Sequence, residues 1–212
     1  MSAIDPIDAS RSALVIQDLQ NDAIGEHGAF GGSGAETHAR EQNVVANVIA
    51  LAAACRKAGV PVIHVWYIVE PGAAELKQNA ELFRSVRDHE ANVRGTWGAA
   101  PVDGLEPVEG DYVVEKLRVN AFYGTKLDAL LDGLGTESLI ISGAWTNMSI
   151  EHTARHAADA GYHVIVVADG TSTLNAEWHT AALSYALPQV ATIASCKDVA
   201  AALESGATPR TP

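Results

Sequence analysis

Residues 138–161, SLIISGAWTNMSIEHTARHAADAG, contain the pattern that decides the fold of this chain. The stretch begins with an apolar run, Ser138–Gly143, which has the length and composition of a buried strand. After a short turn, the alanine-rich segment 148–160 is typical of a helix, and Gly161 is a fitting C-terminal residue for it. Strand, turn and helix in this order form one unit of a parallel sheet, so we expect further units on both sides.

Five more apolar runs alternate with helical patterns along the chain. Strands are predicted at Ser12–Asp18, Pro61–Tyr67, Asp111–Lys116, His163–Asp169 and Val190–Ser195. Helices are predicted at His38–Ala58, Ala73–Asp88, Lys126–Leu134, Glu177–Leu187 and Asp198–Leu203, and a long loop at Arg94–Glu109. Strands that are nearly all apolar and alternate with helices indicate an α/β fold in which helices cover both faces of a parallel sheet.

Composition and charge narrow the class of protein. The 212 residues include 14 Lys and Arg against 26 Asp and Glu, a formal net charge of −12, which argues against binding to nucleic acid or to an anionic membrane surface. With no repeat or linker, we expect one domain over residues 1–212, with its core at about 10–204 and a loose tail at 205–212. No apolar run is long enough to cross a bilayer and no export signal is visible, so a cytoplasmic location is expected.

Reactive side chains stand at the carboxyl ends of three predicted strands. Asp18 ends the first strand, Lys116 ends the third, and Ser149 follows the fourth at the beginning of a helix. Such ends share one edge of a parallel sheet, where a carboxylate, an ammonium and a hydroxyl at a helix N-terminus suit nucleophilic catalysis. Taken singly, each residue also has a purely structural explanation: Asp18 as a loop cap, Lys116 as a solvated strand end and Ser149 as a capping serine. Their joint placement is what predicts a catalytic site.

Three segments of the chain resemble the isochorismatase-like cysteine hydrolase superfamily. They are VIQDLQND at 15–22, KLRVNAF at 116–122 and GAWTNMSIEHTAR at 143–155, of which the last is the most specific. The superfamily includes nicotinamidases, N-carbamoylsarcosine amidohydrolases, ureidoacrylate amidohydrolases and isochorismatases, and the resemblance spans about residues 10–204. It implies a Rossmann-like, six-stranded, mostly parallel sheet in a three-layer α/β/α sandwich, and assembly into a homodimer or homotetramer.

The resemblance also implies how the site works. An Asp–Lys–Cys triad attacks an amide carbonyl and forms a thioester, with Asp18 as the base and Lys116 as the second member. The N–H groups of Trp145 and Ser149 hold the oxyanion, and the Ala144–Trp145 peptide bond is cis. This chain departs from the family at the nucleophile, because Ser149 stands where cysteine is usual. A serine hydroxyl is much harder to ionise than a thiol.

Three explanations of Ser149 stay open. The chain is a natural serine variant that hydrolyses amides, or it carries an engineered Cys-to-Ser change that traps a substrate. Alternatively, it resembles the isochorismatases, which lack this cysteine and use the Asp, here Asp18, to protonate a vinyl ether. A natural or engineered variant that has lost turnover would be a small-molecule-binding member. Among these alternatives, we predict amide hydrolysis: a hydrolase that cleaves the C–N bond of a small amide with Asp18, Lys116 and Ser149.

Aromatic and basic side chains near the predicted site are candidates for contact with a small, planar substrate, including an anionic one. They are Trp97, Arg118, Phe122, Tyr123 and His152. No metal is predicted, because the His152–His156 spacing lacks the glutamate of a zinc protease and residues 64–67, HVWY, lack the Asp-x-His of nicotinamidases. The two cysteines lack a CxxC spacing, and the first strand has no dinucleotide fingerprint, so no zinc site and no cofactor are predicted.

Overall fold

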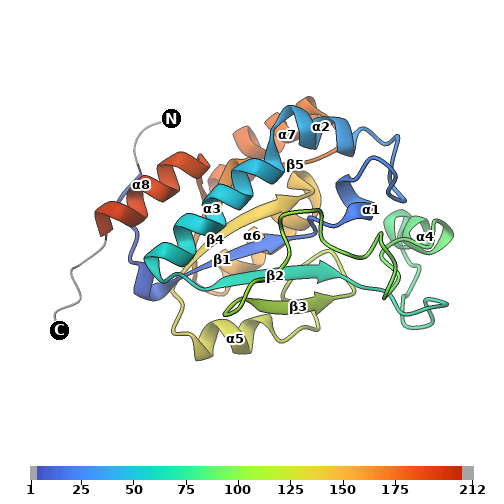
Figure 1. Ribbon diagram of the computed structural model, residues 1–212, viewed down its shortest axis with the longest axis horizontal. Helices are drawn as coiled ribbons and strands as arrows, with labels where there is room; N and C mark the ends of the chain where they lie inside the picture. The colour runs from blue at the N-terminus through green and yellow to red at the C-terminus, as the bar shows by residue number, and fades with distance from the viewer. Residues whose placement is uncertain (1–3, 207–212) are drawn as a thin grey trace.

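All six predicted strands are present, and they form one sheet (Figure 1). The structure is a computed structural model that describes residues 4–206. The sheet has the order β3-β2-β1-β4-β5-β6, and each strand runs parallel to its neighbours. The strands are β1 (Ser12–Gln17), β2 (Val62–Tyr67), β3 (Tyr112–Lys116), β4 (Ser138–Ala144), β5 (His163–Ser172) and β6 (Thr192–Ala194).

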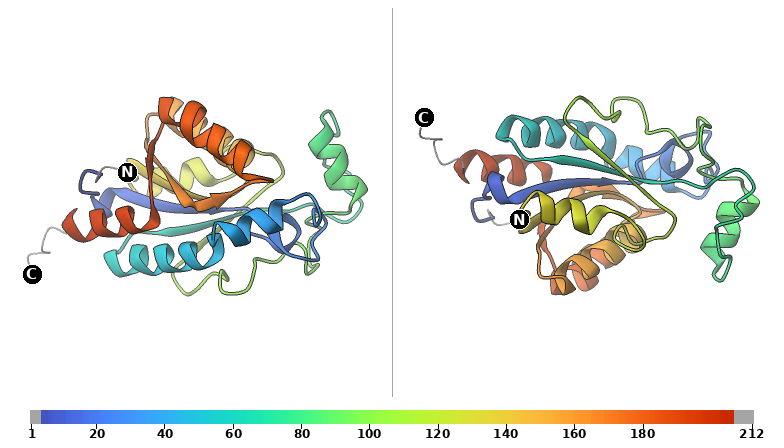
Figure 2. Two further views of the ribbon diagram at one scale, coloured as in Figure 1. Left: turned by 90° about the horizontal axis from the view of Figure 1, so that it is seen from above. Right: turned by 90° about the horizontal axis from the view of Figure 1, so that it is seen from below.

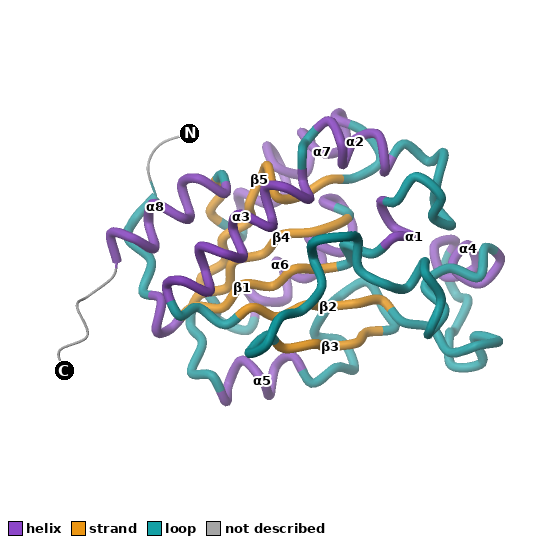
Figure 3. The backbone as a smooth tube through the Cα atoms, in the orientation of Figure 1, coloured by secondary structure: helices purple, strands orange, loops and turns teal. Residues whose placement is uncertain are grey.

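Helices cover both faces of this sheet, which makes a three-layer α/β/α sandwich (Figure 2). The α-helices are α1 (Asn21–Ile24), α2 (Ala35–Glu41), α3 (Val44–Ala58), α4 (Glu81–Asp88), α5 (Leu127–Gly133), α6 (Glu151–Asp159), α7 (Ala176–Ala181) and α8 (Cys196–Gly206). Shorter turns are the 3-10 helices η1 (Ala9–Arg11) and η4 (Leu187–Gln189) and the π-helices η2 (Thr146–Ile150) and η3 (Ala182–Ala186). Loops gather with α1 and α4 at the carboxyl ends of the central strands, on the right in Figure 3.

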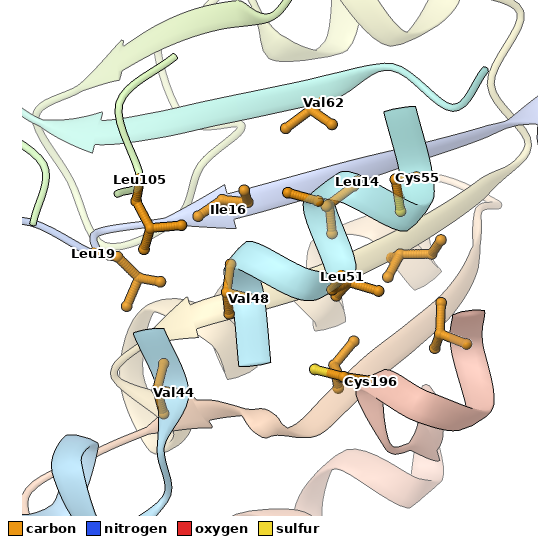
Figure 4. Packing of buried hydrophobic residues seen from close by; sticks show 14 of the residues in the cluster. Leu14, Ile16, Leu19, Val44, Val48, Leu51, Cys55, Val62, Leu105 and Cys196 are labelled. Carbon is orange, nitrogen blue, oxygen red and sulfur yellow. The ribbon is translucent and has the colours of Figure 1, made fainter. Parts of the chain in front are cut away.

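The central strand β1 is buried on both faces, which explains why its sequence is largely apolar. Successive side chains of a strand point to opposite faces. Leu14 and Ile16 therefore pack against α3 and α8, while Ala13 and Val15 belong to the cluster that includes α5 and α6. Figure 4 shows the first of these clusters, where Leu51 of α3 lies against the sheet.

Two predicted helices are shorter than expected, for identifiable reasons. The helix predicted over His38–Ala58 is broken into α2 and α3, because Asn43 between them adopts a left-handed conformation with φ 53. The helix predicted over Ala73–Asp88 is present only as α4. The preceding residues 71–80 form turns and a loop instead, and the Arg118 guanidinium donates a hydrogen bond to the carbonyl of Lys77 there. A contact from a distant part of the chain thus overrides local helix propensity.

The other boundaries differ by a few residues. The segment predicted as a helix from Met148 begins at Thr146 as the π-helix η2, and the helix predicted to end at Leu187 changes into η3 and η4 around Pro188. Ser205 of the predicted tail lies in α8, and residues 207–212 lie outside the described residues. Within residues 4–206, no helix combines the length and apolar character that crossing a bilayer requires.

Candidate active site

Strands β1, β3 and β4 bring three reactive side chains together beyond the carboxyl edge of the sheet. Asp18 directly follows β1, Lys116 is the last residue of β3, and Ser149 lies in η2 after β4. Their exposed fractions are 7%, 3% and 8%. Because β2 separates β3 from β1, only a long side chain reaches across, and the Lys116 ammonium passes 5.5 Å from the ring centre of Tyr67, the last residue of β2.

The ammonium of Lys116 joins the other two side chains. Its Nζ lies 2.7 Å from Oδ2 of Asp18 and donates to the carbonyl of Val119 at 2.8 Å and to Oγ of Ser149 at 3.3 Å. An ammonium has three protons, so all of them are used. The second carboxylate oxygen, Oδ1 of Asp18, is buried and has no hydrogen-bond partner within the described chain. One acceptor therefore stays free beside the hydroxyl.

Burial shifts the pKa values of this ion pair toward each other. Removal from water raises the pKa of Asp18, and the nearby Lys116 ammonium only partly opposes this. The same desolvation lowers the pKa of Lys116 against the effect of Asp18. A carboxylate with a raised pKa is a better proton acceptor, which suits a general base.

The turn before Ser149 is shaped for close backbone contact. Gly143 has φ 129, and a Cβ there would lie 2.0 Å from the carbonyl oxygen of Gln17, so only glycine fits. The Ala144–Trp145 peptide bond is cis, which confirms the expectation from the resemblance. In residues 4–206 the Trp145 N–H donates no hydrogen bond and is available to an oxyanion. The roles predicted for the Trp145 and Ser149 N–H groups stay predictions.

Buried polar residues that the sequence reasoning missed hold this turn in place. Nδ1 of His179 lies 2.8 Å from the hydroxyl of Thr146, and burial lowers the pKa of His179 to about 4, which keeps the imidazole neutral. The Thr173 hydroxyl donates to the side chain of Asn147 at 2.5 Å. Gln17 donates from Nε2 to the carbonyl of Ser149 at 3.3 Å. No local pattern marks these residues, because their partners lie far away in the sequence.

A small pocket opens beside the three reactive residues. Its cavity volume is about 50 Å³, and its polar lining consists of Asp18, Tyr67, Asn92 and Ser149. The rest of the lining is apolar and comes from Ala23, Phe30, Leu82, Val86, Val119, Ala144, Trp145 and Met148. A single water molecule needs roughly 10–15 Å³ of cavity volume, so the pocket has room for a small molecule.

The five predicted substrate contacts do not line this pocket. Trp97 and Tyr123 are 56% and 68% exposed, because their loops turn outward. Arg118 donates to the carbonyl of Lys77 and stacks 4.1 Å from the ring centre of Phe83.

The side chains of Phe122 and His152 also lie outside the pocket. Phe122 is buried in the cluster that includes α5 and α6, and its ring stacks 4.5 Å from that of His156. His152 is exposed on α6, and its Nδ1 lies 3.0 Å from the carbonyl of Met148. The sequence placed these residues near the site but could not orient their side chains.

No group of three or more His, Cys, Asp or Glu side chains is arranged to hold a metal ion in the part of the chain that the structure describes. Its two cysteines, Cys55 and Cys196, are free and buried, away from the pocket. The absence of a metal requirement stays a prediction.

The chain is similar to known proteins in sequence and in structure. A model of the isochorismatase domain matches residues 12–198. Ureidoacrylate amidohydrolase RutB from Methylobacterium radiotolerans is 33% identical over 193 residues, which cover 84% of this chain and 74% of that protein. A cysteine hydrolase from Pseudomonas syringae pv. phaseolicola shares the fold, with a TM-score of 0.85 and 23% identity over 97% of this chain and 98% of that one. N-carbamoylsarcosine amidase from Thermoplasma acidophilum has a TM-score of 0.69 and 26% identity over 88% and 96% of the two chains.

Proposed function

We propose that this chain, which belongs to the isochorismatase family of hydrolases, cleaves the C–N bond of a small amide with Asp18, Lys116 and Ser149. The observation that carries the proposal is the shared ammonium of Lys116, which binds both Asp18 and Ser149 and leaves Oδ1 of Asp18 free. The names of two relatives, an amidohydrolase and an amidase, support amide cleavage.

In the proposed first half of the reaction, Ser149 attacks the amide. Oδ1 of Asp18 accepts the hydroxyl proton while Oγ forms a bond to the carbonyl carbon, and the carbonyl electron pair moves to oxygen. The N–H groups of Trp145 and Ser149 donate to this oxyanion. The electron pair then returns, the C–N bond breaks, and Asp18 gives its proton to the leaving nitrogen, so an acyl ester on Ser149 remains.

In the second half, water takes the place of the amine. Asp18 removes a proton from the water, the resulting oxygen nucleophile attacks the ester carbon, and the C–O bond to Ser149 breaks. The proton on Asp18 passes to Oγ of Ser149, which restores the resting site and releases the carboxylic acid. Lys116 stays protonated throughout, because it holds both side chains and offsets the negative charge.

Product analysis of the native protein tests this function. A panel of small primary amides, ureido compounds and isochorismate is incubated with the protein, and ammonia and pyruvate are measured separately. We expect ammonia release from amides without pyruvate release. Pyruvate release from isochorismate alone would assign vinyl-ether hydrolysis to Asp18 instead. Binding of panel members without any product would identify a binding protein and contradict the proposal.

The pH dependence of kcat/KM is expected to be bell-shaped. Asp18 must be deprotonated to act as a base, so activity is lost as the pH falls through its pKa, which burial raises above the ordinary 3.8. Lys116 must be protonated, so activity is lost as the pH rises through its pKa, which burial lowers from the ordinary 10.5. Because Asp18 and Lys116 are coupled, the acidic and basic sides of the profile both report on the pair rather than on one residue each. Initial rates of ammonia release measured across this range check the expectation, and full activity at a pH below 3.8 would contradict it.

A further inference from the structure

We infer that the substrate is an uncharged carboxamide, whose amide group is bound by Asn92 and whose acyl group is small and apolar. This inference rests on the proposed function and adds the substrate class. Asn92 lies in the chain between β2 and β3, is 4% exposed and lines the pocket together with Asp18 and Ser149.

The backbone of Asn92 is fixed, whereas its side chain has a vacant acceptor. Its N–H donates to Oδ2 of Asp22 at 2.6 Å, and its carbonyl accepts from the N–H of Val69 at 2.9 Å. Its side-chain oxygen Oδ1 is buried and has no partner among the described residues. Buried polar atoms are nearly always paired in folded proteins, so an unpaired one in a pocket indicates a ligand that pairs with it. An oxygen acceptor pairs with the N–H of an amide.

A second unpaired group lines the same pocket. The hydroxyl of Tyr67 is buried and has no partner in the described chain. Burial, with Asp18 nearby, raises the pKa of Tyr67, so the phenol keeps its proton and can donate it. Together, Asn92 and Tyr67 offer one acceptor and one donor, which matches a neutral amide or ureido group.

The charges around the pocket disfavour an anionic substrate. Among residues 4–206, Asp18 is the only acidic or basic side chain that lines the pocket. The three protons of Lys116 are already used, and Arg118 binds Lys77 and Phe83 instead. A substrate carboxylate would therefore lose its hydration and gain no free cation in return, because the Lys116 ammonium is already paired with Asp18. Arg118, one of the predicted substrate contacts, does not line this pocket.

The remaining walls set the character of the acyl group. Leu82 and Val86 of α4 face the pocket together with Phe30 and Trp145, whose rings meet edge to face at 5.3 Å between centres. Apolar walls favour apolar groups through the hydrophobic effect. The cavity of about 50 Å³ limits the size of this group. A short aliphatic or small planar acyl chain fits these walls.

A matched pair of amides tests the inference. Succinamate carries a carboxylate where 4-methylpentanamide has an isopropyl group of similar shape. We expect the native protein to hydrolyse the neutral amide with a kcat/KM at least about 100-fold higher, since no cation meets the carboxylate. Equal rates, or a preference for succinamate, would overturn the inference while leaving amide hydrolysis intact.

A substitution at Asn92 tests its contact with the amide. Asn92 has a left-handed backbone with φ 56, which glycine adopts readily, so Asn92→Gly preserves the backbone conformation and removes the side-chain acceptor. We expect kcat/KM for 4-methylpentanamide to fall about 10- to 100-fold, mainly through KM. The matched control is Asn43→Gly, at an exposed left-handed asparagine with φ 53, which should leave the kinetics unchanged. Native kinetics in Asn92→Gly would overturn the contact.

Binding separates this inference from the proposed function. If no amide releases ammonia, the proposed function fails, and calorimetric titration of the same two amides still reports on the pocket. Tighter binding of 4-methylpentanamide, weakened by Asn92→Gly and not by Asn43→Gly, supports the inference. Tighter binding of succinamate, or binding of neither amide, overturns it.

Discussion

Asp18→Asn is expected to lower kcat/KM for amide hydrolysis about 10²–10⁴-fold, the range that removal of a general base produces. Asparagine keeps the shape of the side chain but cannot accept the proton of Ser149. The loss corresponds to about 3–5 kcal/mol of transition-state stabilisation. Because Asp18 activates both the nucleophile and the later water, acylation and deacylation should both slow. Single-turnover and steady-state measurements of ammonia release check the two steps.

The same substitution also leaves the buried ammonium of Lys116 without its counterion, so folding has to be controlled. Removal of one partner from a buried ion pair costs about 3–5 kcal/mol, whereas replacement of both by neutral groups is often close to neutral. The double variant Asp18→Asn, Lys116→Met should therefore regain thermal stability and stay inactive. Near-native activity in either folded variant would show that Asp18 is not the base.

The fold was predictable because each strand of the sheet carries its own signal. Segments such as Ser138–Ala144 are largely apolar, since both faces of the sheet are covered, and this pattern is local. The positions of Asp18 and Lys116 followed from the same rule, because strand ends in a parallel sheet share an edge. Helix boundaries were less predictable where a distant side chain such as Arg118 binds the backbone.

The wall of the pocket could not be predicted, because it depends on contacts between distant segments. Leu82 and Val86 reach the pocket only because α4 packs over the carboxyl ends of the strands. Asn92 is placed by Asp22, a residue 70 positions away in the chain. Trp97 and Tyr123 looked equally suitable in the sequence, and only the direction of their loops excludes them from the pocket.

Ser149 decides between the mechanisms that Asp18 alone cannot separate. Loss of Asp18 would stop both amide hydrolysis and protonation of a vinyl ether, whereas only acyl transfer needs an atom that bonds to the substrate at position 149. Ser149→Ala should therefore abolish ammonia release. Retention of native turnover in this variant would remove serine acylation and leave chemistry that uses Asp18 without a nucleophile.

Ser149→Cys is expected to raise amide turnover about 10- to 100-fold, because a thiol with a pKa of about 8.5 ionises far more readily than a hydroxyl. The Lys116 ammonium, 3.3 Å from Oγ in the native site, would stabilise the thiolate. Initial rates of ammonia release measure the gain. A variant that is folded and slower than the native protein on every amide that the native protein accepts would contradict acyl transfer at this position.

Alkylation with iodoacetamide gives an independent measure of the same thiolate. The native chain provides a low background, because burial raises the pKa of Cys55 to about 12 and also raises that of Cys196. Ser10→Cys is the reference, since Ser10 is exposed and precedes β1 at the opposite edge of the sheet. Lys116 and the N-terminus of η2 should make the Ser149→Cys thiol titrate at a lower pH than this reference, despite its burial. If it titrated at a higher pH, burial would outweigh Lys116, and the site would not be built to activate a thiol.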